Sequence, residues 1–362
     1  MEILIVTTVS GTMNFFETQI KEMLDKGIKV HLATNFKVGE IRFETGDLIK
    51  HQIDFSRSVK SKENIKAYTQ LKTVTENNNF NVIHTHTPIA STLIRLQRIK
   101  KTTKIYYTAH GFHFYKGAPK KNWLIYYIVE KLLAYRTDKL IVINEEDYEI
   151  AKNKFKMKEL ILINGPGVDL NLIQTLEPIN RASLGMNESD FILIFGAELN
   201  KNKNQYLLID AVKILNEKYS NIKLLLVGKD NYDNKYQEYV KQLGLERSVK
   251  FLGLRSDLKR IIKSCDLALS SSKREGLGLF LIEALASGIP VIATDNRGSK
   301  EIIVDGKNGF LVGFNDVEMA NKIEEIYLDS ALLKSLSTGA SENLEKFSRE
   351  SINERVMDLY YE

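Results

Sequence analysis

Short apolar runs alternate with longer amphipathic stretches along the chain, and this alternation stops once and then restarts. Runs rich in Ile, Leu and Val, without strict polar alternation, predict strands buried on both faces of a parallel sheet. In the first half these runs are Ile3–Val6, Lys29–Ala33, Asn81–His84, Lys104–Thr108 and Lys139–Ile143. In the second half they are Phe191–Phe195, Lys223–Val227, Val249–Leu252, Leu267–Ser270 and Pro290–Ala293. Strands that alternate with helices over the whole chain predict an α/β fold with helices on both faces of each sheet.

The break in the alternation predicts two domains. Asn164–Asp169 interrupts the pattern and Pro178 follows, so we place the linker at about 165–180. We expect doubly wound domains at 1–168 and 169–345 that face a central cleft, because ligands of such sheets bind outside the carboxyl ends of the strands. The stretch Ser348–Tyr360 has a helical pattern, and we expect the segment 346–362 to cross back onto the first domain.

The first long helix is expected between Asn14 and Gly27. Asn14 is a favoured N-cap residue, and Glu17 stands three positions later, as in a capping box. Gly27 is a common residue at the end of a helix.

The composition is that of a soluble globular protein rather than a disordered or fibrous chain. Of the 362 residues, 43% are hydrophobic and 27% are charged. No apolar run approaches the ~20 residues that a membrane-spanning helix needs, and the N-terminus lacks the basic region of a signal peptide. The single cysteine, Cys265, excludes a disulfide framework and a cysteine-based zinc cluster. We therefore expect a cytoplasmic protein.

Positive charge is concentrated in the first half of the chain. Residues 1–165 hold 26 Lys and Arg against 17 Asp and Glu, and 60–140 hold 15 against 4. Lysines mixed with aromatic rings favour an anionic membrane surface, which we expect on the inner face of the cell membrane. The residues expected to face it are Lys100, Lys101, Lys120, Lys121 and Trp123. A solvated basic face remains the alternative, whereas nucleic acid is disfavoured because no recognised binding motif accompanies the charge.

The segment from Ser270 to Ala293 reads as strand, loop, helix and strand. Glycines ahead of a helix let backbone amides approach a ligand, and the positive end of the helix favours an anion such as a diphosphate. Glu275 on the loop and Glu283 on the helix could both reach one extended ligand as acceptors for sugar hydroxyls. The alternative is that Glu283 is a solvated helix residue and that Gly276 and Gly278 only cap the helix.

Two glutamates at this spacing, Glu275-x7-Glu283, resemble the signature of retaining glycosyltransferases of the family-4 type. That family has the GT-B fold, with two Rossmann-like domains. Five further segments are similar to family motifs: Tyr107-Thr-Ala-His-Gly111, Asn164–Asp169, Ala197–Lys203, Val249-Lys-Phe-Leu-Gly253, and Gly298 with Glu301 and Asp305–Val312. The resemblance is closest to bacterial enzymes that build capsular polysaccharide or exopolysaccharide.

The resemblance implies a role for each matching residue. The catalytic residues would be His110, Glu275 and Lys203, with His110 and Glu275 on the donor sugar and Lys203 on the diphosphate. The donor would also be bound by Gly276, Leu277, Gly278, Leu279, Glu283, Gly253, Leu254 and Arg255. The acceptor side would include Gly11, Thr12 and Asn14. The departing phosphate would take the proton of the acceptor on the same face of the sugar.

Two positions depart from the family pattern. Glu198 stands where the phosphate loop usually has an arginine, and an anion there cannot bind a diphosphate directly. Either Lys201, Arg274 or another cation supplies the charge, or Glu198 orients Lys203. The first loop carries a single glycine, Gly11, in place of the usual pair.

All six histidines lie in the first half, at 31, 51, 84, 86, 110 and 113. His84 and His86 end a strand on one face, and we expect them to be packed there. No Asp-x-Asp pair exists and no acidic or cysteine ligand lies near the histidines, so we expect no metal and no cofactor. The fingerprints of dinucleotide-binding, P-loop and serine-hydrolase enzymes are also missing.

The resemblance therefore implies a hexosyltransferase or N-acetylhexosaminyltransferase that moves a sugar from a nucleotide-diphosphate sugar, expected to be UDP-linked, to a lipid-linked saccharide. The alternatives are a UDP-sugar epimerase of the same fold and a nucleotide-sugar-binding protein that has lost catalysis.

Overall fold

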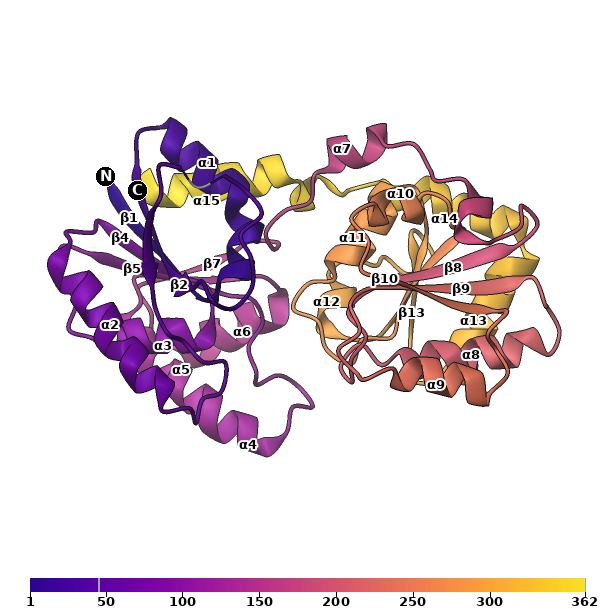
Figure 1. The fold of residues 1–362 in the computed structure, drawn as a ribbon, viewed down its shortest axis with the longest axis horizontal. Helices are drawn as coiled ribbons and strands as arrows, with labels where there is room; N and C mark the ends of the chain where they lie inside the picture. Colours follow the sequence, from indigo (N-terminus) through magenta and orange to yellow (C-terminus); the bar gives the residue numbers. More distant parts are fainter. Residues whose placement is uncertain (45, 362) are drawn as a thin grey trace. The chain divides into compact units, whose positions relative to one another are not determined.

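The computed structural model describes residues 1–44 and 46–361, which fold into two compact units (Figure 1). Unit 1 contains Met1–Gly167 and the residues from Glu350 onward, and unit 2 contains Val168–Arg349. The division between Gly167 and Val168 lies inside the segment where the sequence pattern breaks.

Unit 1 is built on a seven-stranded parallel sheet with the order β3-β2-β1-β4-β5-β6-β7. Its strands are β1 (Glu2–Val9), β2 (Lys29–Asn35), β3 (Ile49–Gln52), β4 (Val82–Thr85), β5 (Lys104–Ala109), β6 (Lys139–Val142) and β7 (Glu159–Leu162). The first six follow the strand order of doubly wound nucleotide-binding sheets, in which the order reverses beside β1.

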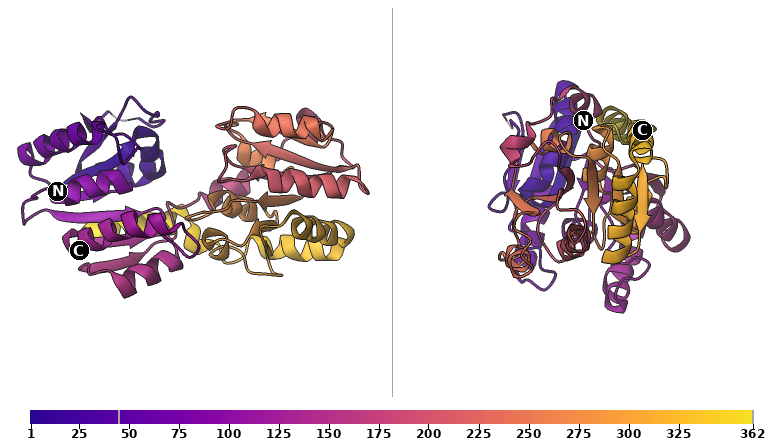
Figure 2. Two further views of the ribbon diagram at one scale, coloured as in Figure 1. Left: turned by 90° about the horizontal axis from the view of Figure 1, so that it is seen from below. Right: turned by 90° about the vertical axis from the view of Figure 1, so that its right-hand side faces the viewer.

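Helices cover both faces of this sheet (Figure 2). The helical segments are η1 (Ser10–Phe16), α1 (Glu17–Asp25), α2 (Glu63–Asn77), α3 (Pro88–Arg95), α4 (Lys120–Asn122), η2 (Trp123–Tyr127), α5 (Ile128–Leu133), η3 (Ala134–Arg136), α6 (Glu145–Lys154) and α15 (Arg349–Tyr361). Apolar residues of α1 and α15 pack on Ile3 and Ile5 of β1. Those of α2 and α3 pack on Leu4 and Val6, which project to the opposite face because side chains alternate along a strand.

Unit 2 repeats the same architecture with a six-stranded parallel sheet in the order β10-β9-β8-β11-β12-β13. Its strands are β8 (Phe191–Gly196), β9 (Ile222–Val227), β10 (Val249–Gly253), β11 (Leu267–Ser270), β12 (Val291–Thr294) and β13 (Gly309–Val312). Its helical segments are α7 (Leu170–Thr175), η4 (Arg181–Leu184), α8 (Gln205–Asn216), α9 (Lys235–Gln242), α10 (Leu258–Ile262), α11 (Leu279–Ala286), α12 (Arg297–Lys300), α13 (Asp316–Leu328), α14 (Ser330–Ala340) and η5 (Glu345–Phe347). The expected doubly wound parallel sheets are thus confirmed in both units.

Helix α15 belongs to the core of unit 1 although it follows unit 2 in sequence. Its Ile352, Val356 and Met357 join the cluster formed by β1, β2 and α1. The Tyr360 hydroxyl hydrogen-bonds with His84 Nδ1 on β4. The chain therefore completes unit 1 only after it has built unit 2.

Three strands and one helix start differ from the sequence-based expectation. The runs of β3, β7 and β13 were not predicted as strands, and all three lie at sheet edges, where a strand lacks the continuous buried run of a central one. The predicted capping box at Asn14 is wrong, because η1 covers Ser10–Phe16 and α1 begins at Glu17 without a side-chain cap.

Candidate functional site

A cavity of about 260 Å³ lies in unit 2 at the carboxyl ends of β8 and β11. These adjacent strands are where the strand order of the sheet reverses, the usual ligand position in such sheets. Of the predicted site residues, Lys203, Glu275, Leu277, Gly278 and Leu279 line it. The sequence analysis therefore identified residues from two loops that the fold brings together.

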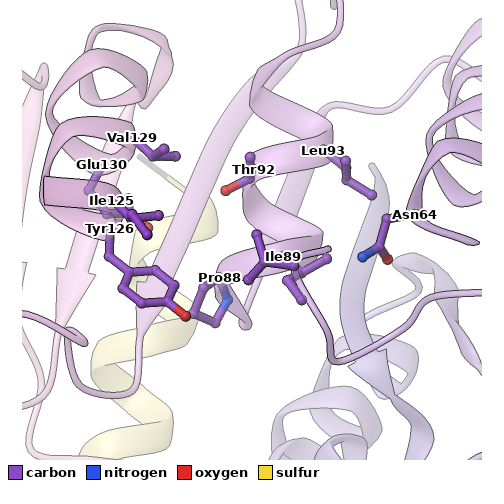
Figure 3. A pocket seen from close by; sticks show the side chains of 10 residues that line it. Asn64, Pro88, Ile89, Thr92, Leu93, Ile125, Tyr126, Val129 and Glu130 are labelled. Atoms are coloured by element: carbon purple, nitrogen blue, oxygen red, sulfur yellow. The ribbon is translucent and has the colours of Figure 1, made fainter. Parts of the chain in front are cut away.

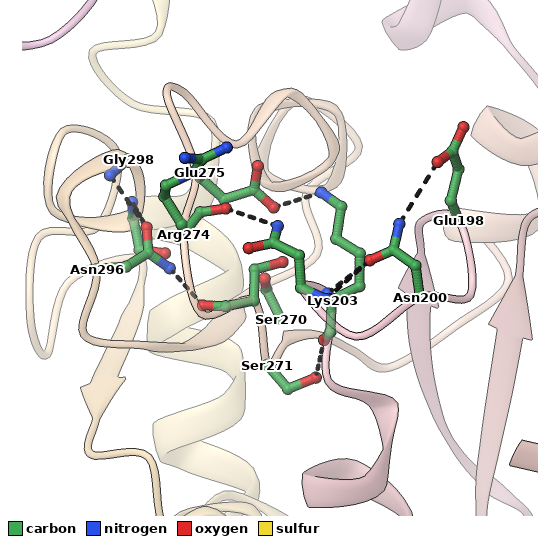
Figure 4. Close-up of polar contacts among 12 residues, drawn as sticks. Glu198, Asn200, Lys203, Ser270, Ser271, Arg274, Glu275, Asn296 and Gly298 are labelled. Carbon is green, nitrogen blue, oxygen red and sulfur yellow. Dashed lines mark hydrogen bonds and ion pairs between the residues drawn. The ribbon is translucent and has the colours of Figure 1, made fainter. Parts of the chain in front are cut away.

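An ion pair between Lys203 and Glu275 crosses one side of this cavity (Figure 4). The Lys203 Nζ atom donates to Glu275 Oε1, and the side chains are 24% and 15% exposed, respectively. A partly buried cation is thus held beside the N-terminus of α11, which begins after Gly278. Both groups favour a bound anion.

Hydrogen bonds join the loop of Lys203 to the loop of Glu275. Asn202 Nδ2 donates to the Arg274 carbonyl at 3.0 Å, and the Lys273 amide donates to the Asn202 carbonyl at 2.8 Å. Ser271 Oγ donates to the Lys203 carbonyl at 2.7 Å. The relative position of the lysine and the glutamate is therefore set by the backbone as well as by the ion pair.

Asn200 links the Glu198 side chain to the backbone of the Lys203 loop. Asn200 Oδ1 accepts the backbone amides of Asn202 and Lys203 at 3.0 Å each, and its Nδ2 donates to Glu198 Oε2 at 3.4 Å. The Glu198 side chain is exposed and points away from the Lys203 ammonium (Figure 4). Of the alternatives stated for Glu198, these contacts favour the one in which Glu198 helps to orient Lys203. It would do so through Asn200, which binds the backbone amides of the Lys203 loop.

The turn at the start of α12 contacts the backbone of Glu275. Asn296 Oδ1 accepts the amides of Gly298 and Ser299 at 3.0 and 3.1 Å, and its Nδ2 donates to the Ser272 carbonyl at 3.0 Å. Arg297 Nε donates to the Glu275 carbonyl at 3.2 Å. The sequence analysis missed Asn296 and Arg297 as site residues, although an Asn two positions before a Gly at the end of a strand is a recognisable helix-cap signal.

The other predicted donor-binding residues do not line this cavity: Gly276, Glu283, Gly253, Leu254 and Arg255. Glu283 pairs with Lys259 on α10 at 3.6 Å. Burial raises the pKa of the Glu283 carboxyl, while Lys259 and Arg349 act in the opposite direction. Arg255 binds both carboxylate oxygens of Asp257, at 2.6 and 2.7 Å. Leu254 is 68% exposed, and Gly253 adopts a φ of 66°, which favours glycine.

In unit 1, His110 ends a column of histidines at the carboxyl ends of β4 and β5. His110 Nε2 lies 3.4 Å from His86 Nδ1, and the rings of His86 and His84 stack with centroids 4.1 Å apart. His84 and His86 are only 1% and 4% exposed, so the expectation that they are packed is confirmed. Burial lowers the pKa of His84 to about 3 and that of His110 to about 4, and it lowers the pKa of His86 well below its usual value.

In the loop expected to face the acceptor, the Asn14 side chain forms hydrogen bonds with backbone groups of unit 1. Asn14 Nδ2 donates to the carbonyls of Gly11 and Glu40 at 3.1 and 2.9 Å, and its Oδ1 accepts the Arg42 amide at 2.8 Å. The side chain therefore fixes the loop around Glu40, and Gly11 and Thr12 lie beside that braced loop on η1.

The basic region of unit 1 exposes the side chains of Lys100, Lys101, Lys120 and Lys121. Trp123 is half-buried: its ring packs near Phe114, and its Nε1 donates to the Tyr115 carbonyl at 3.3 Å. Apolar side chains are exposed in the same region, among them Leu124, Ile125, Ile128 and Leu132.

Among residues 1–44 and 46–361, no helix is long and apolar enough to cross a membrane. Within the same residues, no group of three or more His, Cys, Asp or Glu side chains is arranged to hold a metal ion. Burial raises the pKa of the Cys265 thiol, whose Sγ lies 3.2 Å from the Ile261 carbonyl.

Two family models match most of the chain. The model described as "Glycosyl transferases group 1" matches residues 177–343, and "Glycosyl transferase 4-like" matches residues 3–144. The chain is 40% identical over 343 residues to EpsD of Bacillus subtilis (strain 168), which is itself provisionally named a glycosyltransferase. That match covers 92% of this chain and 89% of EpsD.

A second relative and one solved structure carry more specific names. UDP-Gal:alpha-D-GlcNAc-diphosphoundecaprenol alpha-1,3-galactosyltransferase of Escherichia coli is 26% identical over 275 residues, which cover 72% of this chain and 70% of that enzyme. The structure of Anabaena HepE in complex with UDP-glucose has a TM-score of 0.79 and 21% identity, and covers 100% of this chain and 99% of that one.

Proposed function

The chain belongs to the group 1 glycosyltransferases, a family with the GT-B fold, and from this premise we propose a donor, an acceptor and a reaction. The proposal is that the protein transfers a sugar from a UDP-sugar to a lipid-linked saccharide, with retention of configuration, in capsular polysaccharide or exopolysaccharide synthesis. The observation that carries the proposal is the Lys203–Glu275 ion pair across a cavity at the N-terminus of α11.

In this proposal the cavity of unit 2 takes the diphosphate and the sugar of the donor. Lys203 and the backbone amides of Gly276–Leu279 bind the diphosphate, since a cation and a helix N-terminus both stabilise negative charge. Glu275 accepts hydrogen bonds from sugar hydroxyls, and Glu283 accepts them from the ribose. Gly253, Leu254 and Arg255 contact the base.

The reaction forms a bond between the acceptor oxygen and the anomeric carbon while the bond from that carbon to the diphosphate breaks. Negative charge grows on the leaving phosphate, and the fixed positive groups around it stabilise the transition state. The departing phosphate takes the proton of the acceptor hydroxyl on the same face of the sugar. We assign His110 to the donor sugar, where a neutral imidazole serves as a hydrogen-bond partner.

The names of the similar proteins support the choice of donor and acceptor. The E. coli enzyme is named for a UDP-linked sugar and a diphosphoundecaprenol acceptor, and the HepE structure is described with UDP-glucose. We assign the acceptor side to unit 1, with Gly11 and Thr12, and place the protein on the cytoplasmic face of the cell membrane. The exposed Lys100, Lys101, Lys120 and Lys121 would attract anionic lipid.

Calorimetric titration with UDP, GDP and ADP in buffer containing EDTA tests the donor site. Preference for UDP without metal supports the proposal, whereas preference for GDP or ADP would replace the donor class. Turnover of UDP-sugars is then measured with and without lipid-linked saccharides. Conversion of a UDP-sugar that needs no acceptor would indicate an epimerase, and nucleotide binding without any turnover would indicate a binding protein.

A further inference from the structure

A second cavity, of about 180 Å³, lies in unit 1, far in sequence from the loops of Lys203 and Glu275. It is bounded by α3, by η2 and α5, and by the start of α2 at Asn64 (Figure 3). Val59, on the segment before α2, also lines it. Aliphatic residues or proline supply six of its ten lining residues: Val59, Pro88, Ile89, Leu93, Ile125 and Val129. The wall at Ile125 and Tyr126 is a π-helical turn, a rare form often found at functional sites.

The strongly polar side chains of the wall are already bound to other parts of unit 1. Glu130 accepts hydrogen bonds from Arg95 Nη2 at 2.8 Å and from the Tyr107 hydroxyl at 3.3 Å. Asn64 Oδ1 accepts the Ser56 amide at 3.0 Å, and its Nδ2 donates to the Ser58 carbonyl at 2.9 Å. The cavity therefore suits an apolar ligand better than a sugar or a nucleotide, which needs several polar partners.

Two exposed apolar residues line this cavity, and exposed lysines lie close to them along the chain. Val59 and Ile125 line it although they are 57% and 50% exposed, so the cavity opens to solvent between them. Lys121 precedes Ile125 by one helical turn, and Lys60 and Lys62 follow Val59; all three lysines are exposed. This arrangement complements an amphiphile with a hydrocarbon chain and an anionic head.

We propose that this cavity binds the first part of the prenyl chain of a lipid-diphosphate acceptor, with the neighbouring lysines close to the diphosphate. The inference rests on the proposed lipid-linked acceptor. A cavity of about 150 Å³ with an aliphatic lining holds a six-carbon ring, so about 180 Å³ admits a short branched segment of chain. The remaining chain would follow the exposed Leu124 and Ile128.

Calorimetric titration with farnesyl diphosphate, in saturating UDP to occupy the cavity of unit 2, tests this site. Inorganic diphosphate is the probe for the head group alone. Ile125→Gln and Val59→Gln change two exposed lining residues from different segments of the chain, so we expect the fold to be retained, and thermal unfolding checks this. Each should weaken farnesyl diphosphate binding about tenfold, since each buried methylene group is worth about fourfold in affinity.

Leu132→Gln is the matched control, because Leu132 is 66% exposed on the same helical region but does not line the cavity. Unchanged binding in this variant, with weakened binding in the other two, supports the site. Equal weakening in all three variants would overturn the proposal, because it would indicate binding to a general apolar surface. The proposal would also be overturned if farnesyl diphosphate bound no more tightly than inorganic diphosphate. UDP affinity in the absence of prenyl ligand tests the proposed function separately.

Discussion

Gly298 lies directly against Glu275, so that a β-carbon added at position 298 would stand 2.7 Å from the Glu275 β-carbon and 3.1 Å from its carbonyl oxygen. Neither atom is the end of a flexible side chain, and the two residues can separate only if a loop moves. Glycine at 298 is therefore part of what holds Glu275 toward Lys203.

Replacing this glycine should lower turnover without unfolding unit 2. Gly298→Ala should reduce kcat about tenfold or more, because small displacements of a substrate-binding group lose large factors in rate. Steady-state kinetics with a UDP-sugar measure the effect. Ser299→Ala is the neighbouring control and should be nearly neutral, since the buried Ser299 Oγ has no hydrogen-bond partner among residues 1–44 and 46–361. Equal loss in both variants would show that the turn is merely sensitive to change.

Lys203→Ala should weaken UDP binding by about tenfold to a hundredfold, since it removes a partly buried charge that we assign to the diphosphate. Calorimetry measures the affinity. Glu198→Gln is the control and should change it little, because the exposed carboxylate contacts Asn200 and not the lysine ammonium. Unchanged UDP affinity in Lys203→Ala would assign the diphosphate to another cation.

Glu275→Gln should reduce transfer by about a hundredfold while UDP binds nearly as before. The amide keeps the shape of the side chain and a hydrogen-bond acceptor for Lys203, but it loses the negative charge that we assign to binding of the sugar hydroxyls. Single-turnover transfer and UDP titration are compared in the same preparation. Turnover close to the wild-type rate would remove Glu275 from the donor-sugar site.

Changing Lys120 and Lys121 to Glu should weaken binding to phosphatidylglycerol vesicles, at about 1 kcal/mol for each charge lost near the surface. Co-sedimentation at low and at physiological salt measures this. The control makes the same change at Lys213 and Lys334, two exposed lysines of unit 2. If both double variants bind the vesicles equally well, the basic region is not the membrane surface.

The free energy of unfolding should fall as the pH drops below about 6.5. The pKa values of His84 and His110 are lowered to about 3 and about 4 in the folded protein, so the unfolded chain binds more protons in this range. Each such histidine lowers the free energy of unfolding by about 1.4 kcal/mol for every pH unit below the pKa that it has in the unfolded chain. Denaturant unfolding at pH 7.5, 6 and 5 measures the slope, and a flat profile would contradict the buried neutral histidines.

The sequence predicted the central strands and the loops of Lys203 and Glu275 because each depends on neighbouring residues. Leu267–Ser270 is a short apolar run that ends at a glycine-containing loop, and such a pattern predicts a buried strand. Strand β3 could not be found in this way, since it pairs only with β2 in the sheet and its residues are mostly exposed.

Features that depend on distant partners were not predictable. Arg95 reads as part of a basic surface run, yet it is 1% exposed and paired with Glu130, 35 positions away. Asn14 reads as an N-cap, but its amide binds the loop around Glu40, which lies 26 positions later. A local pattern gives the chemistry of a side chain and not the identity of its partner.

The position of α15 also determines the order in which the protein can mature on the ribosome. Unit 2 is a continuous segment, Val168–Arg349, and all of it is synthesised before residues 350–361. The cluster that needs Ile352, Val356 and Met357 stays open until then, which leaves Ile20 and Met23 of α1 without part of their cover. During synthesis, the segment translated first is thus the unit that finishes folding last, and its uncovered apolar surface is the part that a nascent-chain chaperone would bind.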